Sequence, residues 1–521
     1  MNRMEKTVTR SFSVVAGLLM GFLSLLSFCA TGVNQTDLAW EKVYMQPDSL
    51  LVSLAGLIVS ALIAGLVCHV AARWTPWQRR RWVIGVASGL TGLGLLWVVI
   101  SKTVPQADQW MCCELAKAMN RGDYSSLQPG GYAAMYSHQL GLISWLRVLH
   151  VLFGEGMVVA FQIFNVLMIP LLVICGDQLI DEIVKPPLQR QAAGLLLTLF
   201  CLFAPMLLYT PFVYGDLSSA ALTFLAAVLL LKCLRRFRWR WGIGLALAMA
   251  SAMALRTNTM IFVIAAGVVL TVRLIGGKRP AVLKTTLCLA AGVLLWRGSL
   301  FLLYDRYQTP QSTMPSLLWI AMGTQQSDLG PGWYNAYNLA TFRASGWQRQ
   351  PAQDAAIACL QQFVRQLYAD PHAGLRFYLQ KIQTQWNVPM VQALAMNNRF
   401  AQSPSPLVAS VYFKGGRELL DGLMNFVQLA VYAGAAWGLI QDRKKTIPGQ
   451  LLMITVFGGF LFSLLWEAKA RYVLPYQLML LPYAALGWAM LSDSLGHGIF
   501  RKKRILRHDD QSAQQDNPQP Q

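Results

Sequence analysis

Near the C-terminus the chain reads Trp466-Glu467-Ala468-Lys469-Ala470-Arg471-Tyr472. This charged stretch separates two apolar runs, at roughly 449–465 and 473–492, and each run is long enough to cross a membrane as a helix. A charged link between two spans must lie at a membrane face. Two cations flanked by aromatic side chains there suit a phosphate or pyrophosphate near the lipid headgroups. The alternative interpretation is an ordinary charged loop that keeps a helical hairpin hydrated.

The composition of the whole chain is typical of helical membrane proteins. Of the 521 residues, 55% are hydrophobic and only 13% are charged, whereas soluble domains carry about 25% charged residues. Apolar runs long enough to span a bilayer recur along the chain, and no signal-peptide cleavage site clearly follows the first of them. We therefore expect an all-α polytopic membrane protein with about 12 transmembrane helices. The nine cysteines show no metal-ligand spacing and are interpreted as packing residues.

The basic residues predict the orientation of these helices. The expected spans are 11–32, 50–72, 82–102, 157–176, 190–209, 214–233, 240–255, 257–275, 282–304, 420–440, 449–465 and 473–492. Most Lys and Arg residues then fall in connections on one side, which is the pattern that sets membrane topology. The formal net charge of +20 is therefore explained without nucleic acid as a partner. We predict a multi-pass protein of the inner (cytoplasmic) membrane with both termini in the cytoplasm.

Two segments are expected to lie on the outer side. In the loop 103–156, residues 139–153 are predicted to form an interfacial or re-entrant helix, because counting them as a span would break the charge asymmetry. Residues 305–419 contain a helical stretch at about 351–386 and are predicted to form a small helical extracytoplasmic portion. The rest of the chain is predicted to consist of three parts. They are a transmembrane module at 1–304, C-terminal transmembrane helices at 420–492, and a basic, then disordered, cytoplasmic tail at 493–521.

Polar residues that this topology places on the outer face define a candidate site. Asp108 is the first acid after the third span, where partial desolvation would suit it to act as a base or a metal ligand; a helix N-cap is the alternative. The candidate substrate- or phosphate-binding residues on the same face are Glu114, His138, Asp216, Arg256, Glu467, Lys469, Arg471 and Tyr472. Their convergence on one face carries more weight than any single residue.

The sequence predicts no nucleotide cofactor, because it contains neither a phosphate-binding Walker loop nor a glycine-rich dinucleotide loop. No metal-binding motif was found either, although a divalent cation remains possible. The lipid bilayer is an expected partner.

Short motifs in the outer segments resemble the GT-C class of integral membrane glycosyltransferases. They are Ala107-Asp108-Gln109-Trp110, Gly122-Asp123-Tyr124 with Tyr136-Ser137-His138-Gln139-Leu140-Gly141, Tyr214-Gly215-Asp216, and Glu467-Ala468-Lys469-Ala470-Arg471-Tyr472. The last is similar to a late Glu-x-x-x-Arg-Tyr motif of many bacterial members. The chain is more distantly similar to enzymes of the protein O-mannosyltransferase and aminoarabinose-transferase type, and it lacks the Asp-Glu pair of the former.

The resemblance implies transfer of a sugar from a polyprenyl-phosphate donor to an acceptor hydroxyl of the cell envelope, in a glycan, a lipid or a protein. It also implies that Asp108 is the catalytic base. Arg256, Lys469 and Arg471 would then hold the donor phosphate. Two alternatives remain. One is an enzyme like O-antigen polymerases or ligases, which would use late outer-loop residues such as Arg365, His372 and Arg376. The other is a lipid or glycan transporter.

Overall fold

The computed structural model describes residues 3–34, 41–277, 279–309, 311, 313–442 and 445–515. Within these residues, ten helices are long and apolar enough to cross a membrane, which confirms an all-α polytopic membrane protein. Two further predicted spans are shorter helices. The span at 190–209 is divided into α8 (Gln189–Leu202) and α9 (Pro205–Leu208), and the span at 240–255 is α11 (Trp239–Leu255). The division has a local cause, because Pro205 has no N–H to continue α8.

The membrane helices follow the apolar runs closely. They are α1 (Arg3–Cys29), α2 (Leu50–Ala71), α3 (Pro76–Ser101), α7 (Met157–Ile183), α10 (Asp216–Arg235), α12 (Met260–Ile275), α13 (Arg279–Tyr304), α19 (Gly415–Gln441), α20 (Leu451–Leu465) and α21 (Leu474–Gln515). The predicted helix at 139–153 is present as α6 (Leu140–Phe153). Gly154, with a φ of 56°, ends it before α7 begins, so α6 and α7 are separate helices in one apolar stretch, Ser137–Ile183.

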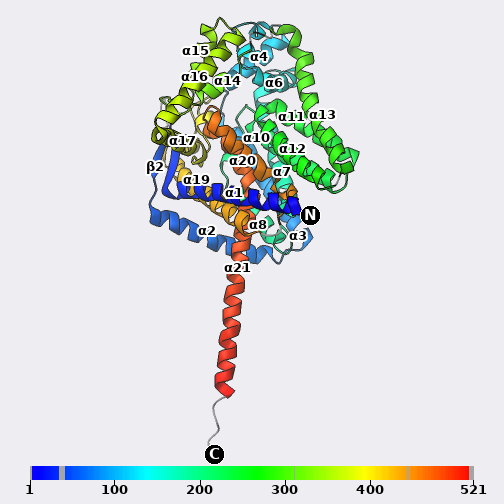
Figure 1. Ribbon diagram of the computed structural model, residues 1–521, viewed down its shortest axis with the longest axis vertical. Coiled ribbons are helices and arrows are strands. Elements are labelled where there is room, and N and C mark those ends of the chain that lie inside the picture. Colours follow the sequence, from blue (N-terminus) through cyan, green and yellow to red (C-terminus); the bar gives the residue numbers. More distant parts are fainter. Residues whose placement is uncertain are drawn as a thin grey trace, which may run out of the picture.

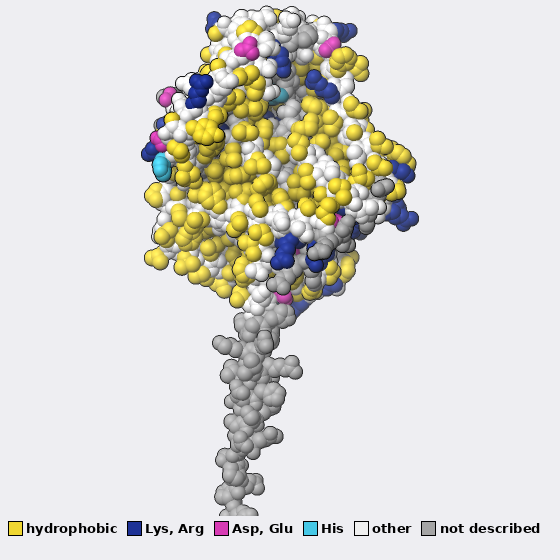
Figure 2. Space-filling view, viewed as in Figure 1, with side chains coloured by type: hydrophobic (Ala, Val, Ile, Leu, Met, Phe, Trp, Pro, Cys, Tyr) yellow, Lys and Arg dark blue, Asp and Glu magenta, His cyan; other side chains and the backbone are white. Residues whose placement is uncertain are grey.

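Small residues allow the C-terminal membrane helices to pack closely. In α19 and α21, Gly434 and Gly487 face each other, and a Cβ atom at Gly487 would overlap the Gly434 carbonyl. Such close backbone contact is a common way for helices to associate in lipid. By contrast, α2 is mostly exposed. Figure 2 shows hydrophobic side chains over most of one face of the molecule, with charged side chains toward its margins.

The segment 305–419, which was predicted to lie on the outer side, contains the helices α14 (Leu317–Met322), α15 (Tyr337–Ala344), α16 (Arg349–Ala369) and α17 (Pro371–Trp386). Asp370 separates the last two helices and caps α17 by accepting a hydrogen bond from the Ala373 amide at 2.9 Å. Figure 1 shows α14, α15 and α16 together with α4 (Asp108–Asn120) and α6 at the end of the molecule opposite the C-terminal part of α21.

Two features were not anticipated from the sequence. An antiparallel hairpin of β1 (Ala30–Asn34) and β2 (Val43–Pro47) follows α1. In addition, α21 continues to Gln515, whereas the later part of the segment 493–521 was predicted to be disordered. The sequence contains no proline between Pro482 and Pro518, so no helix-breaking residue interrupts this stretch. Residues 516–521 lie outside the described residues.

The predicted orientation can be tested by labelling cysteines in intact cells. In a variant without the nine native cysteines, we expect Gln361→Cys on exposed α16 to react with a membrane-impermeant thiol reagent, and Arg80→Cys at the start of α3 to be protected. The reason is the charge asymmetry of the connections. Labelling of Arg80→Cys together with protection of Gln361→Cys would reverse the predicted topology.

Candidate functional site

A cavity of about 680 Å³ lies where the ends of several membrane helices meet the segments that contain α4 and α14. Its polar lining includes Glu41, Asp108, His138, Tyr214, Arg256, Tyr334, Glu467, Lys469, Arg471 and Tyr472. Most of them lie at the ends of membrane helices: Glu41 follows α1, Asp108 follows α3, Tyr214 precedes α10, Arg256 connects α11 to α12, and residues 467–472 connect α20 to α21. His138 and Tyr334 belong to the segments before α6 and between α14 and α15. Because consecutive spans alternate in direction, these helix ends lie at one face of the membrane region. The structure therefore brings together most of the residues singled out in the sequence.

Asp108 is placed in the cavity by two glutamines on either side of it in the sequence. Gln106 Nε2 donates to Asn398 Oδ1 at 2.8 Å and to the Met396 carbonyl at 3.1 Å. Gln109 Nε2 donates to the same Met396 carbonyl at 3.1 Å, and its Oε1 accepts from the Val213 amide at 2.9 Å. The start of α4 is thus fixed to the buried segment 388–398 and to the segment that leads into α10.

Asp108 is not a helix N-cap, although that was the alternative interpretation. The capping position belongs to Ala107, and no side-chain capping bond is present. Instead, Tyr132 donates to Asp108 Oδ1 at 2.9 Å and Tyr214 donates to Oδ2 at 3.1 Å. Ala107 has a φ of 47°, a conformation that is unfavourable for a residue with a Cβ and is often found next to functional sites.

The carboxylate of Asp108 is kept ionised by its surroundings. Burial by itself would raise the pKa of Asp108, but the cations of Arg471 and Lys469 and the hydroxyls of Tyr132 and Tyr214 hold this pKa below its usual value. At neutral pH Asp108 is therefore an anion that can accept a proton, which is the requirement for a general base.

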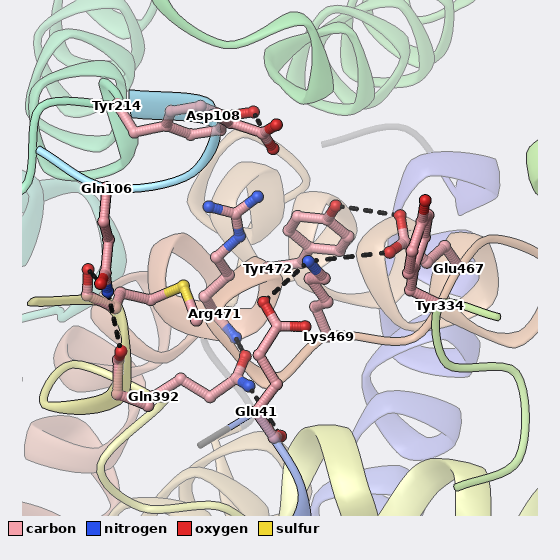
Figure 3. A network of polar contacts seen from close by, with 12 residues as sticks. Glu41, Gln106, Asp108, Tyr214, Tyr334, Gln392, Glu467, Lys469, Arg471 and Tyr472 are labelled. Atoms are coloured by element: carbon pink, nitrogen blue, oxygen red, sulfur yellow. Dashed lines mark hydrogen bonds and ion pairs between the residues drawn. The ribbon is translucent and has the colours of Figure 1, made fainter. Parts of the chain in front are cut away.

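Arg471 is the counterpart of Asp108 and is only 5% exposed. Its guanidinium packs 4.6 Å from the centre of the Tyr214 ring and 5.3 Å from that of Tyr472, and its backbone amide donates to Gln392 Oε1 at 3.1 Å. Figure 3 shows the guanidinium directed toward Asp108. Within the described part of the chain, no carboxylate forms an ion pair with Arg471 and its Nε has no hydrogen-bond partner. A buried cation in this state is well suited to an anionic ligand.

Lys469 is paired, unlike Arg471. Its Nζ lies 3.1 Å from Glu41 Oε1 and 3.8 Å from Glu467 Oε1, as Figure 3 shows. Burial would lower the pKa of Lys469, but these two carboxylates raise it above its usual value. Tyr472 donates to Glu467 Oε2 at 3.3 Å. Because Glu467 and Arg471 are buried and the side chain of Lys469 is only 12% exposed, the stretch 466–472 is not an ordinary hydrated loop.

Arg256 and His138 complete the wall of the cavity. The Arg256 guanidinium packs against Tyr214 and Tyr472, the same two rings that Arg471 contacts. It also forms an ion pair with Asp216 at 3.3 Å. Asp216 is 2% exposed and lies behind Arg256 in a smaller neighbouring cavity. His138 packs edge-on against Trp319 of α14.

The structure does not bring Glu114, another candidate from the sequence, to this cavity. Its half-exposed side chain pairs with Lys117 at 3.4 Å and does not line the cavity. Successive helical residues are rotated by about 100°, so Glu114, six positions after Asp108, points to another side of α4. Helical periodicity alone could have excluded it. Within the described residues, no group of three His, Cys, Asp or Glu side chains is arranged to hold a metal ion.

Several residues of the site were not recognised from the sequence. Glu41 follows the first membrane helix and reaches Lys469. Tyr132 contacts Asp108, and Gln392 contacts the Arg471 backbone. None of them belongs to a pattern that indicates a site, because each acts through a contact between distant segments.

The tyrosine contact predicts a measurable change in pH dependence. In Tyr132→Phe, Asp108 loses a hydrogen bond that stabilises its charged form, so its pKa should rise. In a reaction that uses Asp108 as its base, the acid limb of kcat/KM should therefore move to higher pH, with most activity kept at neutral pH. Tyr334→Phe is the control, because Tyr334 lines the cavity without a hydrogen bond to Asp108. An unchanged acid limb in Tyr132→Phe would contradict the assignment of the limb to Asp108.

No protein-family model matches the chain, and a search of curated proteins also gives no match. Among solved structures, the chain is similar to the archaeal oligosaccharyltransferase AglB from Archaeoglobus fulgidus, in complex with an inhibitory peptide and a dolichol-phosphate. The sequence identity is 14% and the TM-score is 0.45, over 82% of this chain and 52% of the AglB chain. The chain therefore spans about half the length of that structure. Similarity at this level gives no basis for assigning an activity.

Proposed function

We propose that the protein transfers a sugar from a polyprenyl-phosphate donor to an acceptor hydroxyl at the outer face of the cytoplasmic membrane. The observation that carries this proposal is the pairing of a half-buried carboxylate with a buried guanidinium in one cavity. Asp108 is an ionised carboxylate held only by hydroxyl donors, and Arg471 is a cation without a carboxylate partner among the described residues. The first suits a base and the second suits a phosphate.

The proposed reaction uses each group once. Asp108 accepts the proton of the acceptor hydroxyl as the acceptor oxygen forms a bond to the anomeric carbon of the sugar. The bond between that carbon and the donor phosphate oxygen breaks, and polyprenyl phosphate leaves with the bonding electrons. Arg471, with Lys469 and Arg256 nearby, stabilises the charge on the leaving phosphate. Glu467 and Glu41 orient Lys469.

A lipid-linked donor also fits the apolar side of the cavity. Met260, Ile261 and Ile264 of α12 and Phe462 of α20 form part of the wall. Ile264 is 63% exposed and lies on a helix that is apolar enough to cross a membrane. A polyprenyl chain could therefore remain in the bilayer beside α12 while its phosphate reaches Arg471.

The remaining parts of the proposal concern location and acceptor. The charge asymmetry supports cytoplasmic termini and an extracytoplasmic site, where the acceptor would be a glycan, lipid or protein of the cell envelope.

No observation favours the polymerase or ligase alternative, since Arg365, His372 and Arg376 are exposed on α16 and α17 and do not line the cavity. Nor is there support for a transporter, whose charged groups would lie near the membrane midplane.

Transfer can be tested directly with purified protein in lipid vesicles. Radiolabelled polyprenyl-phosphate sugars are offered with cell-envelope lipid, glycan and protein fractions, and the labelled product is separated from the donor. We expect a new glycosidic product with the wild-type protein and almost none with Asp108→Asn. Movement of label across the vesicle membrane without any new glycosidic bond would refute the proposal in favour of transport.

A further inference from the structure

A lysine outside the cavity has an unusual environment. Lys381 of α17 is 0% exposed. Its Nζ donates to three backbone carbonyls, those of Gly323, Leu464 at 3.0 Å and Trp466 at 2.9 Å. A buried ammonium group normally requires a carboxylate or several hydrogen-bond acceptors. Here its three protons are used by three carbonyls.

The three carbonyls lie at the ends of two helices. Gly323 is the C-cap of α14, and Leu464 and Trp466 lie at the C-terminal end of α20. The last carbonyls of a helix have no partner within the helix and carry partial negative charge. An ammonium group is therefore a suitable common ligand for both helix ends, and Lys381 connects them to α17.

Glycine at position 332 allows this close arrangement. Gly332 has a φ of 74°, and a Cβ atom there would lie 2.7 Å from Lys381 Cε and from the Gly323 carbonyl oxygen. The Gly332 carbonyl accepts from the Ala468 amide at 2.8 Å, and Trp333 and Ala468 form an isolated parallel bridge. Lys381 thus lies inside a tightly packed junction that includes the stretch 466–472.

This junction immediately precedes the residues that line the cavity. Trp466, whose carbonyl Lys381 binds, stacks on Trp319 of α14 with ring centres 5.9 Å apart and an angle of 3° between the planes. Both tryptophans line the cavity. Lys469 and Arg471 follow within five residues. The position of their backbone therefore depends on how firmly Trp466 and Ala468 are held.

We propose that Lys381 is a positioning residue that fixes the stretch 466–472 by joining the ends of α14 and α20. It does not touch the cavity, and it acts on the donor phosphate only through the backbone that carries Lys469 and Arg471. Its effect on phosphate binding rests on the proposed function, whereas its effect on the backbone does not.

The protonation of Lys381 gives this proposal a distinctive signature. Burial lowers the pKa of Lys381 to about 7. The negative charge of the Glu467 carboxylate opposes this shift. An ammonium group donates three hydrogen bonds, whereas a neutral amine donates two. One carbonyl therefore loses its donor above about pH 7. However, an exposed lysine keeps its ordinary, higher pKa, so any opening that exposes Lys381 must take up a proton there and should become less favourable as the pH rises.

Hydrogen exchange measured by mass spectrometry tests the backbone effect. In a peptide covering 464–473, we expect the amides to exchange at least about fivefold faster in Lys381→Met than in wild type, since a lost hydrogen bond has roughly this effect on an opening equilibrium. The matched control is Lys414→Met, which removes an exposed lysine between α18 (Pro406–Phe413) and α19 and should leave this peptide unchanged.

A pH series adds a test that does not depend on the folding of Lys381→Met. After correction for the intrinsic chemistry of exchange, protection of the peptide in wild type should increase between pH 6 and pH 8.5, because opening must then take up a proton on Lys381. Lys381→Arg stays charged throughout this range, so its protection should not change with pH. Constant protection in wild type, or equal exchange in wild type and Lys381→Met, would overturn the proposal.

Binding of polyprenyl phosphate without a sugar separates this inference from the proposed function. We expect Lys381→Met to bind it about fivefold or more weakly than wild type. Faster exchange with unchanged binding would overturn the link between Lys381 and phosphate binding. If wild type does not bind polyprenyl phosphate while exchange is accelerated in Lys381→Met, the proposed function fails but the structural role of Lys381 stands.

Discussion

Asp108→Asn is expected to reduce sugar transfer by about 10²-fold or more, which is the usual contribution of a general base. The asparagine keeps the size of the side chain and one acceptor oxygen for Tyr132 or Tyr214, but it cannot accept the proton of the acceptor hydroxyl. Because Asp108 is ionised in wild type, the substitution also removes a negative charge facing Arg471. Binding of the anionic donor should therefore be retained or become tighter.

The measurements that decide this prediction are transfer rate, donor affinity and melting temperature on the same preparation. Glu114→Gln is the matched control, since Glu114 lies on the same helix but outside the cavity and pairs with Lys117. We expect it to transfer sugar at nearly the wild-type rate. Near-normal transfer by Asp108→Asn would remove the base from the proposed mechanism, whatever the effect on melting temperature.

Arg471→Ala is expected to weaken donor binding by about 10- to 100-fold. A charge-assisted hydrogen bond contributes about 1.5–3 kcal/mol, and about 1.4 kcal/mol corresponds to a factor of ten. Arg471→Lys should restore only part of this loss, because an ammonium group cannot form the two parallel bonds that a guanidinium makes with a phosphate. The Arg471→Ala substitution should also raise the pKa of Asp108, because one cation fewer would then oppose the effect of burial.

Binding of polyprenyl phosphate and the KM for the donor test this prediction. Arg343→Ala serves as the control, because Arg343 is exposed on α15 and does not line the cavity. It should bind the donor as wild type does. Unchanged donor binding in correctly inserted Arg471→Ala protein would mean that the buried guanidinium serves only to pack against Tyr214 and Tyr472.

The membrane class and the grouping of the candidate residues at one end of the helix bundle follow from the sequence for simple physical reasons. A bilayer core admits few charged residues, so long apolar runs are reliable signals of spanning helices. Because consecutive helices reverse direction, the positions of Asp108, Arg256 and Lys469 in the chain place them at one end of the bundle. Helix lengths were less certain, because a proline such as Pro205 shortens a helix within an apolar run.

The pairing of charges was decided only by the tertiary structure. In the sequence alone, Lys469 and Arg471 are equivalent cations. In the structure, Glu41 reaches Lys469 from a segment more than 400 residues away. Of these two cations, Arg471 is therefore the one left without a carboxylate partner among the described residues. The buried segment 388–398 likewise holds both Gln106 beside Asp108 and the backbone of Arg471. Local sequence patterns record the periodicity of one element, whereas these contacts join elements that are distant in the chain. Which cation is left without a carboxylate therefore depends on packing that no local pattern contains.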